Sequence, residues 1–66
     1  MQILLNGERR EFDHGLSVAA MLETIGCADA KIAVERNLEI VPRSAFAATV
    51  LQPEDRIEIV EFIGGG

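Results

Sequence analysis

One segment of this chain, residues 16–26 with the sequence LSVAAMLETIG, repeats its apolar residues at the period of an α-helix. The apolar stripe consists of Val18, Met21, Leu22 and Ile25, at the i, i+3, i+4, i+7 spacing. Ser17 can cap the helix by accepting a backbone N–H, and Gly26 can end it in a left-handed conformation. Nothing else in a chain of 66 residues could cover this stripe except a sheet. The sequence therefore predicts one main helix packed on a sheet.

The opening sequence MQILLNGERREF predicts a β-hairpin. Asn6-Gly7 is the pair favoured in a two-residue hairpin turn, because both positions require a positive φ. Ile3 and Leu5 alternate onto one face of the first strand. The second strand, residues 8–12, is polar and is expected at an edge of the sheet.

The middle sequence KIAVERNLEIV predicts two further strands joined by a turn around Arg36-Asn37. Leu38 and Ile40 are expected to share one face of the second of these strands. Pro42 ends that strand, because proline has no backbone N–H to donate.

The sequence RSAFAATVL is interpreted as a short helical turn at residues 44–48 with Phe46 packed inward, then a brief extended piece. A turn at residues 52–55, which contains a proline, precedes a strand over residues 56–63. That strand directs Ile57 and Ile59 to one face, and Glu58, Val60 and Phe62 to the other. It therefore carries apolar residues on both faces near its end.

The order strand, strand, helix, strand, strand, strand predicts an α+β fold, with one sheet of four to five strands and one main helix across one face. Residues 1–63 are expected to form a single domain, and residues 64–66 a flexible glycine tail. Only three aromatic residues are present, so the core is expected to be aliphatic.

The formal net charge of −5 argues against a nucleic-acid-binding protein and favours a partner with a basic surface. A single cysteine excludes an internal disulfide and points to a reducing compartment. No apolar run is long enough to cross a bilayer, and no signal peptide is evident. We expect a cytoplasmic protein that is monomeric when free.

Few side chains could carry catalysis. His14 is the only histidine and is interpreted as a solvated turn residue, and Cys27 as a small, partly buried apolar residue. Neither a zinc-ligand spacing nor a nucleotide-binding glycine motif is present. We therefore expect no metal site and no autonomous enzyme.

The sequence ends in Gly64, Gly65 and Gly66. A disordered terminus or a cloning remnant would explain such an end without a function. A functional explanation is that glycines, which lack Cβ, form an arm thin enough for a narrow channel. The arm would deliver the carboxylate of Gly66, which can attack the α-phosphate of ATP to form an acyl adenylate.

The residues before the glycines suggest how a partner would recognise this arm. Val60, Phe62 and Ile63 place apolar surface beside it and could form a docking patch. Alternatively, Val60 and Phe62 pack under the RSAF segment. The acidic residues expected to surround the patch, and to favour a basic partner, are Glu54, Asp55, Glu58 and Glu61.

The stretches MQILLNG, VERNLEIVPR and DRIEIVEFIGGG resemble the ThiS family, the small sulfur carriers of thiamine biosynthesis. The resemblance covers essentially the whole chain. It implies the ubiquitin-like β-grasp fold, a mixed sheet in which the first and last strands lie parallel at the centre. It also implies that Gly65-Gly66 is the functional end, to which Gly64 adds one residue.

The same resemblance implies a mechanism and partners. A ThiF-type adenylyltransferase would use ATP and Mg²⁺ to adenylate Gly66, and sulfur supplied through a cysteine desulfurase would convert it to a thiocarboxylate. A ThiG-type thiazole synthase would accept the sulfur. The chain itself would bind no permanent cofactor.

Three alternatives stay open. The small subunit of molybdopterin synthase shares the fold and the glycine end, although its members tend to carry a proline in the apolar run before the glycines, which EIVEFI lacks. A carrier could also serve another sulfur acceptor or be ligated to lysines. A β-grasp binding module with an inert tail would need no activation at all.

Overall fold

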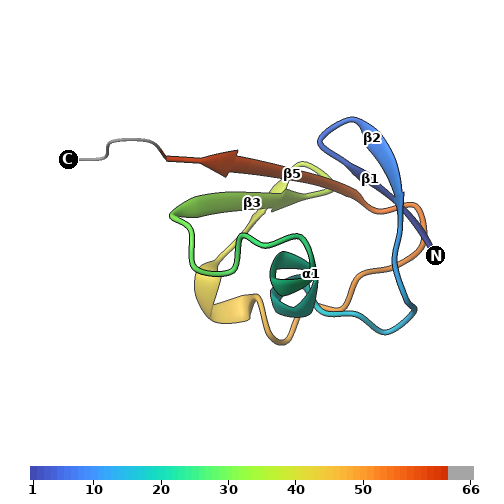
Figure 1. Cartoon of the computed structure of the whole chain (residues 1–66), viewed down its shortest axis with the longest axis horizontal. Coiled ribbons are helices and arrows are strands. Elements are labelled where there is room, and N and C mark those ends of the chain that lie inside the picture. The colour runs from blue at the N-terminus through green and yellow to red at the C-terminus, as the bar shows by residue number, and fades with distance from the viewer. Residues whose placement is uncertain (63–66) are drawn as a thin grey trace.

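The computed structural model describes residues 1–62. Its elements, in chain order, are β1 (Gln2–Leu5), β2 (Glu8–Glu11), α1 (Val18–Thr24), β3 (Ile32–Arg36), β4 (Glu39–Val41), the 3-10 helix η1 (Arg43–Ala45) and β5 (Arg56–Glu61). Figure 1 shows α1 lying across one side of a twisted sheet, with β5 running toward the C-terminal end of the chain. The predicted α+β fold with one main helix is confirmed.

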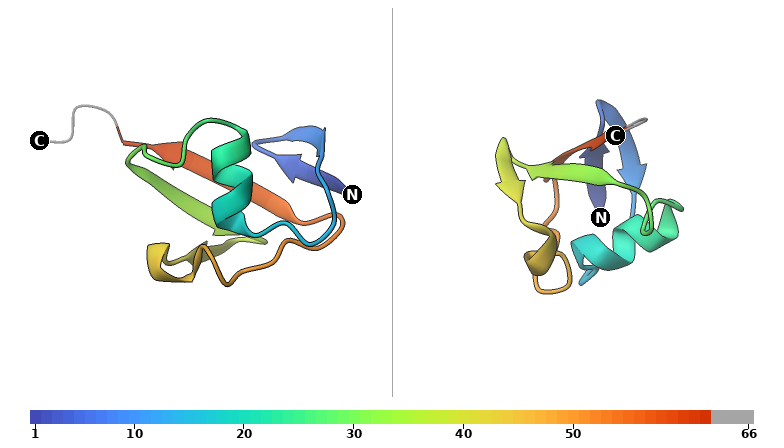
Figure 2. Two further views of the ribbon diagram at one scale, coloured as in Figure 1. Left: turned by 60° about the horizontal axis from the view of Figure 1, so that its bottom comes forward. Right: turned by 90° about the vertical axis from the view of Figure 1, so that its left-hand side faces the viewer.

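The five strands form one sheet in the order β2-β1-β5-β3-β4. The central pair, β1 and β5, is parallel, with Leu5 opposite Ile57, and the other neighbours are antiparallel. Figure 2 shows the two central strands side by side although they lie at opposite ends of the sequence. This pairing, which the resemblance implied, and the edge position of β2 are both confirmed.

The helix forms where the sequence predicts it. The Ser17 hydroxyl accepts the backbone N–H of Ala20 at 3.1 Å, and Gly26 has a φ of +84° just past the last turn. Val18, Met21 and Leu22 are buried against the sheet, and the two polar residues at its end, Glu23 and Thr24, are exposed. Burial of the apolar stripe therefore fixes which side of the helix meets the sheet.

The core is aliphatic apart from two phenylalanines, as composition predicts. Its buried members are Ile3, Leu5, Phe12, Val18, Met21, Leu22, Ile32, Val34, Val41, Phe46, Leu51 and Ile57. Each strand other than β2 contributes at least one of these side chains. The core therefore lies between the inner face of the sheet and the layer formed by α1 and the segment around Phe46.

The second hairpin turn differs from the prediction by one residue. Arg36 pairs with Glu39, so the two-residue loop is Asn37-Leu38 and not Arg36-Asn37. The Asn37 amide donates to Asp55 at 3.0 Å, and its carbonyl oxygen accepts from the Arg56 backbone at 2.9 Å. These bonds to residues far along the chain set the register of the β3–β4 hairpin. A pattern in the local sequence cannot reveal them.

Other boundaries also differ. The short helical turn is a 3-10 helix at Arg43–Ala45, earlier than the predicted 44–48, because the Pro42 carbonyl accepts from Ala45 at 2.8 Å and starts the turn. Phe46 is buried, as predicted. The extended piece is confirmed as a bridge between Val50 and Ser17, and β5 ends at Glu61.

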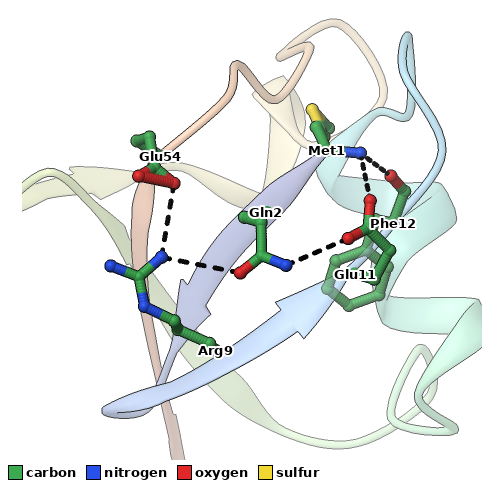
Figure 3. A network of polar contacts seen from close by, with 6 residues as sticks. All are labelled: Met1, Gln2, Arg9, Glu11, Phe12 and Glu54. Carbon is green, nitrogen blue, oxygen red and sulfur yellow. Dashed lines mark hydrogen bonds and ion pairs between the residues drawn. The ribbon is translucent and has the colours of Figure 1, made fainter.

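A polar network closes the open end of the first hairpin (Figure 3). The Met1 ammonium donates to the Glu11 carboxylate and to the Phe12 carbonyl, both at 2.6 Å. Gln2 donates to Glu11 at 3.1 Å, while Arg9 reaches Gln2 and lies 3.6 Å from Glu54. The hydrogen bond from the ammonium, then that from Gln2, hold the pKa of the Glu11 carboxyl below its ordinary value. The network thereby adds to the antiparallel backbone pairing that joins the exposed strand β2 to β1.

Candidate functional site

The last strand presents different side chains to the two sides of the sheet. Ile57 is fully buried beneath the helix, whereas Val60 is 58% exposed on the opposite side. Phe62 continues the alternation just past β5 and is 56% exposed, and its backbone N–H donates to the Lys31 carbonyl at 2.8 Å. The structure therefore places two large apolar side chains in solvent directly before the glycine-rich end.

Neighbouring strands extend this surface. On the side of the sheet opposite α1, here called the uncovered face, Ala33 lies opposite Val60, and Glu35 lies between Glu58 and Ile40. Ile40 is 65% exposed. The uncovered face is therefore a mixture of apolar side chains and carboxylates.

Val60 and Phe62 do not pack under the RSAF segment, so that alternative is wrong. The backbone N–H of Ala19 donates to the Phe46 carbonyl at 3.0 Å, which holds the segment against α1. The segment thus belongs to the helix side of the sheet (Figure 2), whereas the side chains of Val60 and Phe62 are exposed. That Val60 and Phe62 bind a partner stays a prediction, since no partner chain is present.

Asp55, one of the four acidic residues expected around the patch, is instead a buried structural residue. Its carboxylate accepts from Arg36 at 2.7 Å, from the Asn37 amide at 3.0 Å and from the Gln52 backbone at 2.8 Å. Burial by itself raises the pKa of the Asp55 carboxyl. The hydrogen bonds from Arg36 and the other two donors outweigh burial and hold that pKa below its ordinary value.

Glu54 is also remote from the patch. It precedes β5, donates its backbone N–H to the Gln2 carbonyl and lies beside Arg9. The length of β5 separates it from Phe62, because a strand rises about 3.3 Å per residue. Of the predicted acidic border, only Glu58 and Glu61 lie on the stretch that leads to Phe62.

Ile63, Gly64, Gly65 and Gly66, the remaining predicted site residues, lie outside the residues that the structure describes. The predicted tail at 64–66 and the boundary of the domain at residue 63 are therefore untested. The structure shows where the residues just before them lie: β5 leads to Phe62 at the end of the sheet where β3 begins.

The two side chains considered for catalysis lie apart from this face. His14 is exposed in a turn, at a surface hollow that it shares with Met1 and Leu16. Cys27 is half-buried, and burial, reinforced by the Glu61 carboxylate, raises the pKa of its thiol. Across residues 1–62, no three His, Cys, Asp or Glu side chains gather as a metal-binding group. Nor does this part of the chain contain a helix long and apolar enough to span a membrane.

Sequence reasoning did not assign Leu38 and Ile40 to the exposed surface, and placed both on one strand face. Leu38 lies in the turn rather than in β4, and it is 71% exposed. A signal was available for Ile40: it precedes Val41, and adjacent strand residues point to opposite faces, so only one of them can be in the core.

Comparison with known proteins places this geometry in a family. The sequence model described as "ThiS family" matches residues 3–66. The sulfur carrier protein ThiS of Escherichia coli is 35% identical over 66 residues, with all of both chains covered. The crystal structure of the thiamine biosynthesis protein ThiS from Geobacter metallireducens superposes with a TM-score of 0.86 at 35% identity, again covering all of both chains. The predicted β-grasp fold is thereby confirmed.

Two longer proteins are more similar in sequence. The thiazole synthases of Paramagnetospirillum magneticum and Magnetococcus marinus are 48% and 47% identical over 66 residues. The whole of this chain matches, but it spans only 20% of the length of each of these proteins. The similarity thus concerns one segment of a larger polypeptide.

Proposed function

This chain belongs to the ThiS family, and from that premise we propose that it carries sulfur for thiazole formation in thiamine biosynthesis. The observation that supports this most directly is the full-length match to a sulfur carrier of the same size. The chain acts as a carrier and co-substrate, while the catalytic groups belong to its partner enzymes.

The chemistry takes place at the Gly66 carboxylate. In the first step a carboxylate oxygen attacks the α-phosphorus of ATP, pyrophosphate leaves, and an acyl adenylate forms on a ThiF-type adenylyltransferase with Mg²⁺. In the second step a sulfur nucleophile at the oxidation level of sulfide displaces AMP and leaves a thiocarboxylate. The sulfur derives from the persulfide of a cysteine desulfurase, which thiols reduce to the level of sulfide while they are oxidised to a disulfide. A ThiG-type thiazole synthase receives the sulfur from the thiocarboxylate.

The uncovered face supplies recognition for these transfers. Val60 pairs with Ala33 of β3, and the Phe62 backbone N–H donates to the Lys31 carbonyl, so both exposed side chains are presented with little loss of backbone freedom on binding. With Ile63 they form the docking patch, and Gly64 and Gly65 connect that patch to the reactive carboxylate. Glu58 and Glu61 favour enzymes with basic groups around the entrance.

The two thiazole synthases support the assignment of the acceptor. Each of these thiazole synthases contains, within its own polypeptide, a region similar to this whole chain. A covalent connection raises the effective concentration of one component for the other, which is useful when the two must meet repeatedly. A ThiG-type enzyme is accordingly the proposed recipient of the sulfur.

Intact-mass spectrometry tests the proposal. The chain is incubated with a ThiF-type adenylyltransferase, ATP, Mg²⁺ and sulfide, and we expect a mass gain equal to the replacement of one oxygen by sulfur. Deletion of Gly66 should abolish that gain while leaving the melting temperature unchanged. An unchanged mass with an enzyme that charges the Escherichia coli carrier in parallel would refute the proposal. Addition of thiazole synthase together with the carbon and nitrogen precursors of the ring should then return the charged chain to its original mass.

A further inference from the structure

The turn between β3 and β4 contains a residue that is poorly suited to its backbone. Asn37 and Leu38 have φ values of +51° and +70°, the conformation that two-residue hairpin turns require. The first hairpin meets the same requirement with Asn6 and Gly7. A leucine at a positive φ is strained, because its Cβ crowds the backbone. Glycine or asparagine would satisfy this turn better than Leu38 does.

Leu38 also gains nothing from packing. Its side chain is 71% exposed, the largest exposed fraction of any large apolar side chain among residues 1–62. Ile40, two residues later, is 65% exposed. The chain therefore accepts backbone strain and exposes apolar surface at the same position, and the folded monomer offers no compensation at that side chain.

The turn that presents Leu38 is held firmly. The Asn37 backbone N–H donates to the Arg56 carbonyl at 2.8 Å, and its side chain bonds both Asp55 and the Arg56 backbone. Arg36, just before the turn, is ion-paired with Asp55 at 2.7 Å. Such anchoring lowers the conformational entropy lost on binding, so Leu38 has the properties of a preorganised anchor.

This location is distinct from the docking patch. The turn lies at the start of β5, and Phe62 follows the end of that strand, roughly 20 Å away at about 3.3 Å per residue. In Figure 1 the β3–β4 connection is at the end of β5 remote from the C-terminus. An interface of ordinary size on one partner protein could nevertheless cover both Leu38 and Phe62.

Charge defines the partner. Glu39 follows Leu38 directly and is exposed, and Glu35 lies beside Ile40 on the uncovered face. The nearby Arg36 guanidinium is engaged by Asp55, and the chain carries a formal net charge of −5. A second copy of the chain would meet like charge, whereas an apolar pocket bordered by lysine or arginine side chains complements both the leucine and the carboxylates.

We propose that Leu38, supported by Ile40, is a second docking anchor, which inserts into an apolar pocket with a basic border on an enzyme that handles the carrier. The inference rests on the proposed function for the identity of that enzyme: it is the thiazole synthase, since two thiazole synthases contain a region similar to this whole chain in the same polypeptide. The anchor fixes the carrier's orientation at the end of the sheet opposite the glycine arm.

Two substitutions separate binding from folding. Leu38→Gly and Leu38→Asn both suit a positive φ and remove the apolar side chain. We expect each to leave the melting temperature unchanged or raised, and to weaken binding to the thiazole synthase about tenfold, as for a typical anchor residue. Val50→Thr is the matched control, because Val50 is also exposed but lies on the bridge to Ser17, and it should bind normally.

Binding is measured by titration calorimetry with uncharged protein, and sulfur loading is measured separately by mass. Normal affinity of both Leu38 variants for the thiazole synthase would overturn the inference, as would a fall in melting temperature, which would assign Leu38 a structural role. Self-association of the wild type that the Leu38 variants lose in sedimentation would overturn it in favour of a second copy. If the anchor fails, wild-type loading is unaffected; if the proposed function fails, loading is absent whatever Leu38 binds.

Discussion

The two faces of the sheet use the same kinds of residue for different purposes. On the covered face, Ile57 and Val34 are fully buried against the helix layer, whereas on the uncovered face Val60 and Ile40 are mostly in solvent. The contrast extends to charge, since Asp55 is buried in a network and Glu58 is half-buried, with its side chain 43% exposed. Because adjacent residues of one strand serve both faces, side-chain direction rather than residue type decides what each contributes.

The largest contrast is expected between Ile57 and Val60. Ile57→Ala removes a fully buried side chain and should lower the free energy of unfolding by about 2–5 kcal/mol. Val60→Ala trims an exposed side chain and should change it by no more than about 0.5 kcal/mol. Urea denaturation of the two variants side by side measures the difference. Equal losses would show that the uncovered face also supports the fold.

Substitution of the buried carboxylate Asp55 should also cost more stability than substitution of Glu58, although both losses should be smaller than that for Ile57→Ala. Asp55→Ala leaves Arg36 and the Gln52 N–H without their acceptor, and we expect a loss of about 2–4 kcal/mol. Glu58→Ala removes an exposed pair with Arg56 and should cost less than about 1 kcal/mol. Thermal unfolding followed by calorimetry provides both values. A loss for Glu58→Ala as large as that for Asp55→Ala would contradict the comparison.

Acid should destabilise the fold through Asp55, on the covered side of the sheet. The pKa of Asp55 is lowered in the folded state, so its stabilising contribution is fully present above its unfolded pKa of about 3.9 and is lost as the pH falls through the folded value. Unfolding free energies measured between neutral pH and strong acid should therefore decline in that window.

Asp55→Asn should be less stable at neutral pH and should show a shallower acid decline. Glu11 has a lowered pKa as well and supplies part of the remaining slope, so Glu11→Gln is the matched control. A wild-type slope retained in full by Asp55→Asn would assign the acid sensitivity to other groups.

A small effect on stability is expected at Phe62, where the largest effect on recognition is expected. Phe62→Ala removes a side chain that is 56% exposed, and unfolding should change by less than about 1 kcal/mol. Affinity for the adenylyltransferase or the thiazole synthase should fall about tenfold or more. Surface plasmon resonance with both enzymes tests this. A stable variant with wild-type affinity for both would remove Phe62 from the docking patch.

Sequence patterns were sufficient where a single segment determines its own structure. The Asn6-Gly7 turn, the Ser17 cap and the helical stripe depend on residues within a few positions of one another, and all three are confirmed. The alternation along β5 likewise separated Ile57 from Val60 correctly.

Long-range contacts account for what was missed. The turn at Asn37-Leu38 is set by Asp55 and Arg56, and the same contacts removed Asp55 from the expected acidic border. The positive φ of Leu38 was missed because the sequence pattern placed the turn one residue earlier, at Arg36-Asn37. The parallel pairing of β1 with β5 came from the family resemblance, since element order alone does not determine it.

The central position of β1 and β5 has a consequence for biosynthesis. While the ribosome is still translating the middle of the chain, the first hairpin has no partner on its inner edge, because Leu5 pairs with Ile57. The helix can form early from local contacts, but the sheet closes only when the last strand has emerged and inserted between two strands already made. The nascent chain therefore exposes the inner edges of β1 and β3 until the residues of β5 have left the exit tunnel.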